Sequence, residues 1–313
     1  MSSATLNVVG ADILLAREFP PARFIVPGIL PVGLTLLAGR PKLGKSWLAL
    51  DIARAVASGG EVLGQQVEQG PVLFLALEDG PRRLQDRLRM MLGGAHAPPG
   101  LHFATECPAL DAGGEKAIRS WIGGTPGARL VIVDVFQRIR PKAQNGGRLY
   151  ADDYVAALPL KAIADELNIA VVAVVHTRKE SAGVDPFDAI SATTGLVGAA
   201  DHALILDRGQ SGLTLYGRGR DVAEMDLAVS FDTTKARWST LGDREAVNRS
   251  ATRNAIVDAL AGSAGPLGPS EIARLARLSD TVVKQRLAAM VRSGEAEKVG
   301  RGSYLLTHPP SLS

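Results

Sequence analysis

Eight residues near the start of the chain have the types and spacing to bind a phosphate group. Gly39, Gly44, Lys45 and Ser46 stand in the order G-x-x-x-x-G-K-S, between an apolar run and a stretch of helix-forming residues. The two glycines allow a tight turn in which successive backbone N–H groups point at an anion. A helix that begins at this turn adds the positive end of its dipole. The spacing is that of the P-loop, which cradles the phosphates of a nucleotide.

Lys45 and Ser46 have separate tasks in such a loop. The lysine ammonium places a positive charge beside the β- and γ-phosphates, and the serine hydroxyl is a ligand for Mg²⁺. An apolar strand precedes the loop and a helix follows it, and this context argues against a glycine-rich turn that matches by chance. We expect the nucleotide to contact Gly39, Arg40, Pro41, Lys42, Leu43, Gly44, Lys45, Ser46 and Trp47.

A carboxylate ends another apolar run, at a position where open α/β sheets bind ligands. Asp134 follows the apolar residues 130–133, which is the Walker B pattern. A lone acid at a strand end is usually a loop residue. Beside a P-loop, we expect Asp134 to hold Mg²⁺ together with Ser46.

Glu78 is the candidate for the group that orients and deprotonates the attacking water. It follows the apolar run 72–77, and no acid follows Asp134 directly. A nucleotide-hydrolysing enzyme needs such a base. Asp79 is expected to cap the next helix instead.

His176 follows the apolar run 170–175. A lone histidine is more often a structural residue than a functional one. At a strand end beside the γ-phosphate, however, it can distinguish ATP from ADP and pass the signal to the next loop. We expect this sensor role because of the motifs around it.

Apolar runs of strand length alternate with helical stretches between residues 34 and 207. This alternation predicts an α/β fold, with a mostly parallel sheet and helices on both of its faces. Three further runs, 213–216, 226–231 and 236–239, have no helices between them. They predict an antiparallel extension at the sheet edge.

The rest of the chain divides the molecule into an arm (1–27), a nucleotide-binding domain (28–245) and a small C-terminal domain (246–313). The last of these is predicted to contain helices at 248–261, 270–277 and 281–293, with Ser270 as the cap of the second, and a hairpin at 295–306. This order resembles a winged helix. Four basic residues could contact phosphates of duplex DNA, although a protein-binding module is an open alternative: Lys284, Arg286, Lys298 and Arg301.

Charge and composition agree with this division. The chain has 313 residues, is 46% hydrophobic and carries a net charge of +3. Residues 249–313 contain nine Lys or Arg against five Asp or Glu, a net charge of +4, which leaves −1 for residues 1–248. A basic tail beside a near-neutral body suggests nucleic acid, although an ordinary solvated surface fits as well.

The expected compartment is the cytoplasm. The single cysteine, Cys107, excludes an internal disulfide. The start of the chain lacks a basic segment followed by an apolar one, as a secretory signal would have, and the apolar run 169–175 is too short to span a bilayer. No membrane partner is expected.

Six segments together resemble the RecA-like ATPases of the RepA replicative-helicase type, which occur on plasmids, phages and other mobile elements. The match covers about residues 25–240. The segments are residues 39–46, 75–79, 131–134, 176–179, 194–201 and 217–221.

The resemblance implies a RecA-like P-loop fold and a homohexameric ring, with ATP at the subunit interfaces and single-stranded DNA in the central channel. It implies Glu78 as the catalytic base, Asp134 as the Walker B acid and His176 as the phosphate sensor. Arg218 and Arg220 are the candidates for an arginine that acts on the neighbouring subunit's ATP; a surface pair bound to nearby acids is the alternative. No Asn-Lys-x-Asp guanine signature occurs, so ATP is favoured over GTP.

Two loops are expected to face the DNA channel. The first is basic and glycine-bearing, and the second also carries acids, so fewer contacts are expected from it. Flexible surface loops without a DNA role are the alternative. The candidate contacts are Arg138, Arg140, Lys142 and Arg148 in the first loop, and Arg178 and Lys179 in the second.

Two functions are consistent with these residues. The first is an ATP-driven DNA helicase or translocase, and the second is an ATP-gated DNA-binding regulator without unwinding activity. The presence of a base, a sensor and paired arginines favours the motor, because a switch needs little turnover.

Overall fold

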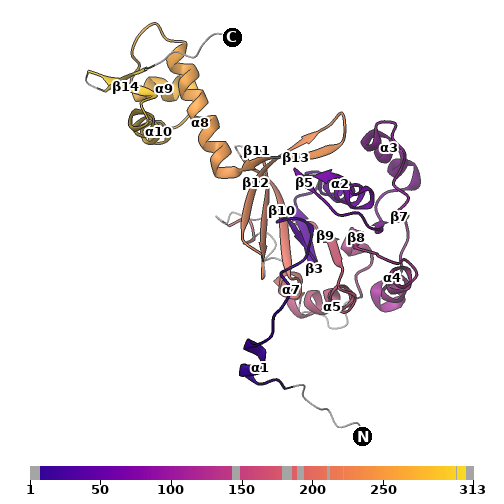
Figure 1. The fold of residues 1–313 in the computed structure, drawn as a ribbon. Coiled ribbons are helices and arrows are strands. Elements are labelled where there is room, and N and C mark those ends of the chain that lie inside the picture. The colour runs from indigo at the N-terminus through magenta and orange to yellow at the C-terminus, as the bar shows by residue number, and fades with distance from the viewer. Residues whose placement is uncertain are drawn as a thin grey trace.

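The computed structural model describes residues 8–142, 149–177, 185–188, 194–209, 212–220, 222–300 and 302–307. Within these residues the main sheet has nine strands, in the order β13-β12-β11-β10-β3-β9-β8-β6-β7 (Figure 1). The strands from β10 to β7 in this order are parallel, and β11, β12 and β13 are antiparallel. The predicted mostly parallel sheet with an antiparallel extension is therefore confirmed. Its strands are β3 (Gly33–Gly39), β6 (Val72–Ala76), β7 (Leu101–Ala104), β8 (Leu130–Asp134), β9 (Ala170–Val174), β10 (His202–Gly209), β11 (Gly212–Gly219), β12 (Met225–Asp232) and β13 (Arg237–Asp243).

Helices cover both faces of this sheet (Figure 1). One face packs against α2 (Lys45–Ser58) and α3 (Pro81–Leu92), and the other against α4 (Gly114–Gly123), α5 (Leu149–Leu167) and α7 (Thr194–Ala199). In the described part of the chain, no helix is both long and apolar enough to cross a membrane.

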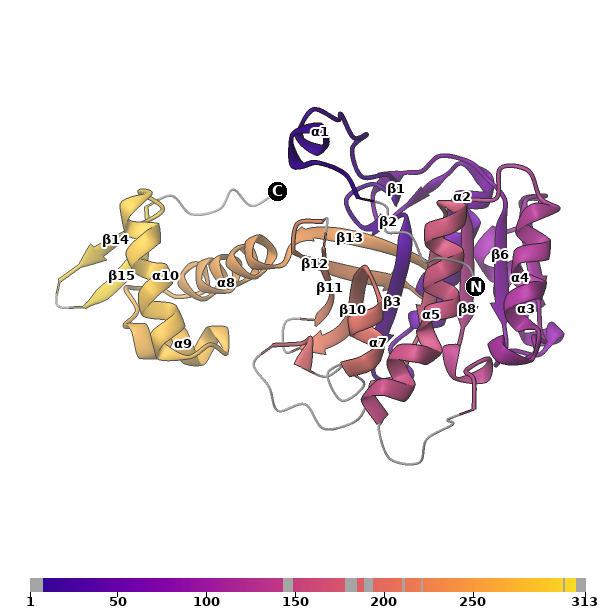
Figure 2. The same cartoon turned by 90° about the horizontal axis from the view of Figure 1, so that it is seen from below.

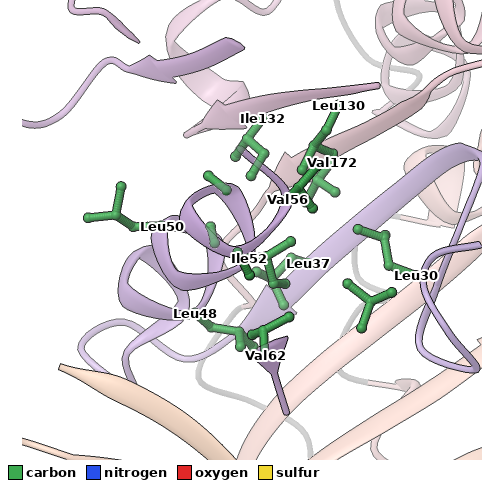
Figure 3. Close-up of a cluster of buried hydrophobic side chains, with 14 of the residues drawn as sticks. Leu30, Leu37, Leu48, Leu50, Ile52, Val56, Val62, Leu130, Ile132 and Val172 are labelled. Atoms are coloured by element: carbon green, nitrogen blue, oxygen red, sulfur yellow. The ribbon is translucent and has the colours of Figure 1, made fainter. Parts of the chain in front are cut away.

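Side chains of strand β3 pack into the buried clusters on both faces of the sheet. Leu34 and Leu36 belong to the buried cluster on the α5 face, whereas Leu37 packs with Leu48 and Ile52 of α2 (Figure 3). Successive side chains of a strand point to opposite faces. Because both faces are covered, the strand is apolar throughout, as parallel strands usually are.

Short elements connect the larger ones. They are α1 (Ala11–Leu15), the pairs β1 (Phe24–Val26) with β2 (Leu30–Pro31) and β4 (Glu61–Val62) with β5 (Gln65–Gln66), and 3₁₀ turns at Leu110–Ala112 and Phe136–Arg138. Ile25 and Val26, which belong to the arm in the sequence-based division, are buried on the α2 face of the sheet. Helix α1, by contrast, buries none of its side chains.

The C-terminal residues form three helices followed by a hairpin, in the predicted order. These are α8 (Arg244–Ala261), α9 (Pro269–Ala276), α10 (Asp280–Arg292), β14 (Ala296–Val299) and β15 (Ser303–Leu306). Helix α8 begins at Arg244 rather than at residue 248, because Asp243 caps it. In both views α8 leads away from the sheet (Figures 1 and 2). The unit has its own buried cluster, which includes Ile256, Leu260, Ile272, Val283, Leu287 and Met290.

The predicted cap of α9 is wrong. Gly268 is the N-cap residue, and Pro269 occupies the first turn, where its missing N–H costs nothing. The Ser270 hydroxyl donates instead to the Asp280 carboxylate, at 2.6 Å.

A buried carboxylate joins α2 to the last strand of the sheet. Asp51 is 1% exposed and accepts hydrogen bonds from the backbone N–H of Trp238 (2.8 Å), from Arg54 Nε (3.0 Å) and from Arg237 Nη1 (3.3 Å). Arg54 is itself buried. A buried charge requires such partners because desolvation costs several kcal/mol.

We predict that Asp51→Ala lowers the free energy of unfolding by about 3 kcal/mol or more, because it leaves the buried Arg54 guanidinium without its carboxylate partner and the Trp238 N–H without its acceptor. Urea denaturation measures the change. The matched control is Asp165→Ala, which breaks an exposed pair with Lys161 on α5 and should cost about 1 kcal/mol or less. Equal losses in the two variants would contradict the assignment.

His202 is a buried ionisable group in β10. It is 4% exposed, and among the described residues its Nδ1 has no hydrogen-bond partner. Burial lowers the pKa of His202 from 6.5 to about 4. The side chain is therefore neutral in the folded protein at neutral pH.

We predict that His202 makes stability fall as the pH drops from about 6.5 to about 4. In this window the unfolded chain binds a proton that the folded chain does not, so protonation favours unfolding, by at most roughly 3 kcal/mol. Asp134 acts in the opposite sense, because burial raises its folded pKa to about 6. The test is therefore the difference between wild type and His202→Gln in melting temperature against pH. As the pH drops from about 6.5 to about 4, the melting temperature of wild type should fall relative to that of the variant, and parallel profiles would contradict the prediction.

Candidate functional site

The loop between β3 and α2 has a backbone that only glycine fits at two positions. Gly39 has φ +151°, and a Cβ there would lie 2.3 Å from the carbonyl oxygen of Leu206 in β10. Gly44 has φ +104°, and a Cβ there would lie 2.7 Å from the ring of Trp238 in β13. Residues of β10 and β13 therefore lie against the loop, and α2 begins directly after it.

Lys45 folds back over this loop. Its Nζ donates to the carbonyl oxygens of Gly39 (2.7 Å) and Arg40 (3.0 Å), and the side chain is buried. Burial lowers the pKa of Lys45 to about 8, against the opposing charges of Asp134 and Glu78. The ammonium is thus poorly solvated, and an anion in the loop would relieve that cost.

Ser46 and Asp134 meet at the start of α2. The Ser46 hydroxyl donates to Asp134 Oδ1 at 3.1 Å. Burial raises the pKa of Asp134 to about 6, and the hydrogen bond from Ser46 acts against this rise. A carboxylate and a hydroxyl are oxygen ligands of the kind that Mg²⁺ prefers.

His176 lies beside Lys45, because the chain after β9 continues along β3. Val175 N–H donates to Leu37 O at 3.0 Å and Thr177 N–H to Gly39 O at 3.3 Å. These bonds bring His176 Nδ1 to 3.0 Å from Lys45 Nζ. Burial, and next the charge of Lys45, lowers the pKa of His176. Neutral imidazole can accept a hydrogen bond from the lysine.

Glu78 follows the C-terminal end of β6 and is exposed to solvent. The preceding Leu77 N–H donates to Asp134 O at 2.8 Å, so the ends of β6 and β8 lie side by side. The charge of Glu78 acts on Lys45, Asp134 and His176 alike. It is therefore near all three groups.

The predicted cap role of Asp79 is wrong. Gly80 is the N-cap residue of α3 and Pro81 opens the helix, so no side chain caps it. Asp79 forms ion pairs with Arg83, at 3.3 Å, and with Arg87. Arg87 also lies over the ring of Trp47, 4.9 Å from its centroid.

Arg218 and Arg220 contact different parts of the chain. Arg218 in β11 pairs with Asp185 (2.9 Å) and Glu224 (2.8 Å). Arg220 lies in the bend after β11, and its Nη2 donates to Gly198 O at 3.1 Å. The contact of Arg218 with Glu224 agrees in part with the alternative that these arginines form surface pairs with nearby acids.

The segment that carries these arginines is also not at the sheet edge, because β12 and β13 lie outside β11. Arg218 pairs in register with Ala203, which pairs with Leu36, well before the P-loop in β3. The distance to Gly39 is about 10 Å along the strands and about 10 Å across them. Neither arginine is therefore beside the P-loop of its own chain.

The candidate DNA contacts differ in their surroundings. Arg140 forms an ion pair with the buried Asp153 of α5, which ties it to the body of the protein. Arg138, Lys142, Lys284 and Lys298 are exposed, and Arg286 is half-buried. The others lie outside the described residues: Arg148, Arg178, Lys179 and Arg301.

Sequence reasoning missed the side chains that support the loop from a distance. Trp238 packs on Gly44, Phe231 lies 5.1 Å from Trp238 between ring centroids, and Trp47 lies 5.8 Å from Phe231. The sequence signal that could have found these residues is that they are aromatic, in a chain of which only 4% is aromatic.

Two solved structures align with this chain. A DnaB-like replicative helicase, described with its interactions with primase, aligns with TM-score 0.51 and 18% identity over 66% of this chain. This chain spans 57% of that chain's length. A KaiC-like protein from the hyperthermophilic archaeon Pyrococcus horikoshii OT3 aligns with TM-score 0.47 and 14% identity, over 70% of this chain and 99% of that one.

The likeness to the DnaB-like helicase shows a RecA-like P-loop fold, which agrees with the predicted fold class. A family model described as AAA domain matches residues 3–182, which is more than half of the chain and includes the P-loop, Glu78, Asp134 and His176. With the site geometry above, this match shows that the chain belongs to the AAA-domain family of P-loop ATPases.

Proposed function

We propose that the chain is an ATP-driven motor of the RepA replicative-helicase type, which acts on single-stranded DNA as a homo-oligomeric ring. The observation that carries the proposal is that Lys45, Ser46, Asp134 and His176 come together at the C-terminal ends of the parallel strands. A phosphate-binding cation, a metal-binding pair and a sensor suit repeated turnover. A switch that only binds ATP does not require all of them.

The chain's residues fit a Mg²⁺-nucleotide. Ser46 and Asp134 would hold Mg²⁺, which neutralises charge on the β- and γ-phosphates. Among the described residues, no group of three or more His, Cys, Asp or Glu could hold a metal by itself. The pair therefore suits a cation whose other ligands are phosphate oxygens and water.

Glu78 is proposed as the base. Its exposed carboxylate stands at the end of β6, beside the end of β8, with Asp134. The adjacent acid, Asp79, is the one that forms ion pairs, with Arg83 and Arg87. An accessible carboxylate can orient and deprotonate a water that attacks the γ-phosphate.

His176 is proposed as the sensor of the terminal phosphate. Its Nδ1 lies 3.0 Å from Lys45 Nζ. A γ-phosphate would compete for that ammonium and release the imidazole. His176 is two residues before Arg178 in sequence, so this exchange would reach the segment that carries the candidate DNA contacts Arg178 and Lys179.

Arg218 and Arg220 are proposed to act on the ATP of a neighbouring subunit. Their position, two strands away from β3, supports action in trans rather than on their own P-loop. Arg218 would have to leave Asp185 and Glu224 to do so. Arg220, with a single hydrogen bond to a carbonyl, is held less firmly.

We also propose that residues 246–313 are a separate winged-helix domain. Its three helices, hairpin and separate core support this assignment. Lys284 and Lys298 are exposed on α10 and β14 and could contact duplex phosphates. In this role the domain would bring the ring to DNA.

The direct test is ATP hydrolysis with and without single-stranded DNA, followed by strand displacement on a forked duplex. We predict that single-stranded DNA raises the ATPase rate and that the enzyme separates the strands. Stimulation without strand separation would favour the ATP-gated regulator. A rate that DNA leaves unchanged would contradict the proposal.

Lys45→Ala should reduce ATP hydrolysis by roughly 10²-fold or more, because it removes the cation that stabilises charge on the γ-phosphate. A phosphate-release assay measures the rate. Lys116→Ala is the control, because Lys116 is an exposed lysine of α4 outside the P-loop. Equal rates in the two variants would overturn the P-loop assignment.

Glu78→Gln should bind ATP like wild type but hydrolyse it roughly 10²-fold more slowly, because the amide cannot accept the proton of the attacking water. Asp79→Asn serves as the comparison, since it weakens the ion pairs with Arg83 and Arg87 and leaves Glu78 in place. If only Asp79→Asn abolished turnover, the base would be the other acid.

A further inference from the structure

The first half of helix α5 has an apolar outer face. Four residues at the spacing i, i+3, i+4, i+7 lie on one side of this helix, and all of them are exposed. We call them the α5 stripe: Ala151, Tyr154, Val155 and Leu158. Farther along the same side, the exposed residues Asp165 and Glu166 are acidic. The apolar surface is therefore confined to the start of the helix, and gathered apolar residues of this kind mark contact surfaces.

The stripe lies near the nucleotide site. Asp153, which directly precedes Tyr154, is buried and forms an ion pair with Arg140. These two residues line the same small cavity as His176, which contacts Lys45. The start of α5 is thus at the C-terminal ends of the parallel strands, where the residues of the nucleotide site meet.

Both segments that are expected to bind DNA adjoin this part of the molecule. The first, residues 138–148, leads directly into α5 at Leu149. The second, residues 178–188, precedes α7, which packs against α5 (Figures 1 and 2). Helix α7 adds one more exposed apolar residue, Val197. The helix that carries the stripe is therefore continuous in the chain with one candidate DNA segment and packs on the helix that follows the other.

Tyr154 gives the stripe a group that can recognise bases. Among the described residues from 24 to 307, it is the single Phe, Trp or Tyr whose side chain is exposed. Proteins that bind single-stranded DNA combine cations for the phosphates with aromatic rings on which bases stack. Arg138 and Lys142 are exposed cations ahead of the helix, and the stripe supplies the ring. The acids of the same turns are less accessible, since Asp153 is buried and Asp152 is half-buried.

We propose that the α5 stripe contacts the bases of single-stranded DNA, with a base stacked on the Tyr154 ring, while Arg138 and Lys142 contact the phosphates. The inference rests on the proposed function and adds the surface that receives the bases. Stacking on a ring does not distinguish the four bases, because each of them has a π-face. The contact therefore holds the strand without reading its sequence, as a motor that moves along DNA requires.

The test measures the dissociation constant of the full chain for a fluorescently labelled thymidine oligonucleotide by anisotropy, with Mg²⁺ and a non-hydrolysable ATP analogue. Tyr154→Ala should raise this constant roughly 10-fold, because a stacking contact is lost. Tyr154→Phe keeps the ring and should bind like wild type. The matched control is Met90→Ala, which removes an exposed apolar side chain on α3 and should also bind like wild type. Equal losses in Tyr154→Phe and Tyr154→Ala would overturn the inference.

Salt dependence and abasic DNA separate stacking from phosphate contacts. Tyr154→Ala should keep the wild-type dependence of affinity on salt, because it removes no phosphate contact, whereas Arg138→Ala should reduce the slope by about 0.7. On an oligonucleotide without bases, wild type and Tyr154→Ala should bind equally. A difference between them that persists on this abasic strand would contradict base stacking.

A Tyr154→Ala variant that binds the thymidine strand like wild type would overturn the inference and leave the proposed function intact. The same conclusion would follow if sedimentation showed weakened assembly of this variant while its assembled form bound DNA normally, because the stripe would then be an interface between copies. A wild-type chain that binds no single-stranded DNA at low salt would overturn both the inference and the proposed motor.

Discussion

The burial of the Lys45 ammonium is the constraint on which the rest of the site depends. A lysine that is only 4% exposed must replace its water with protein, and two carbonyl oxygens of its own loop and the His176 ring do so. The replacement is incomplete, because burial still lowers the pKa of Lys45 to about 8. A triphosphate would supply the missing counter-charge. The loop is thus electrostatically prepared for an anionic ligand.

The scaffold holds this charge through contacts that come from distant parts of the chain. The carbonyl group of Leu206 lies against Gly39 and the ring of Trp238 lies against Gly44, so β10 and β13 determine the path of the loop. Asp51 in turn ties β13 to α2. Since β13 runs directly into α8, the same strand that supports the P-loop also carries the C-terminal unit.

Most of the fold and part of the site follow from local sequence. The order of strands and helices was predictable because each element has its own periodicity. Asp134 and His176 directly follow predicted apolar runs, and Lys45 stands in a P-loop motif. The contacts of Arg218 with Asp185 and of Arg140 with Asp153 were not predictable, since they join polar residues that are far apart in sequence. The caps at Asp79 and Ser270 were wrong for a local reason. A glycine–proline pair already starts each helix, and both side chains found ion-pair or hydrogen-bond partners elsewhere.

The central claim is that Lys45, Ser46 and Asp134 form one Mg²⁺-nucleotide site. A crystal structure with Mg²⁺ and a non-hydrolysable ATP analogue tests it most directly. The account predicts that Lys45 Nζ leaves the carbonyl oxygens of Gly39 and Arg40 for the terminal phosphate, and that a cation lies between Ser46 and Asp134. A nucleotide bound elsewhere, or a Lys45 that keeps both carbonyl contacts with the analogue in the loop, would contradict it.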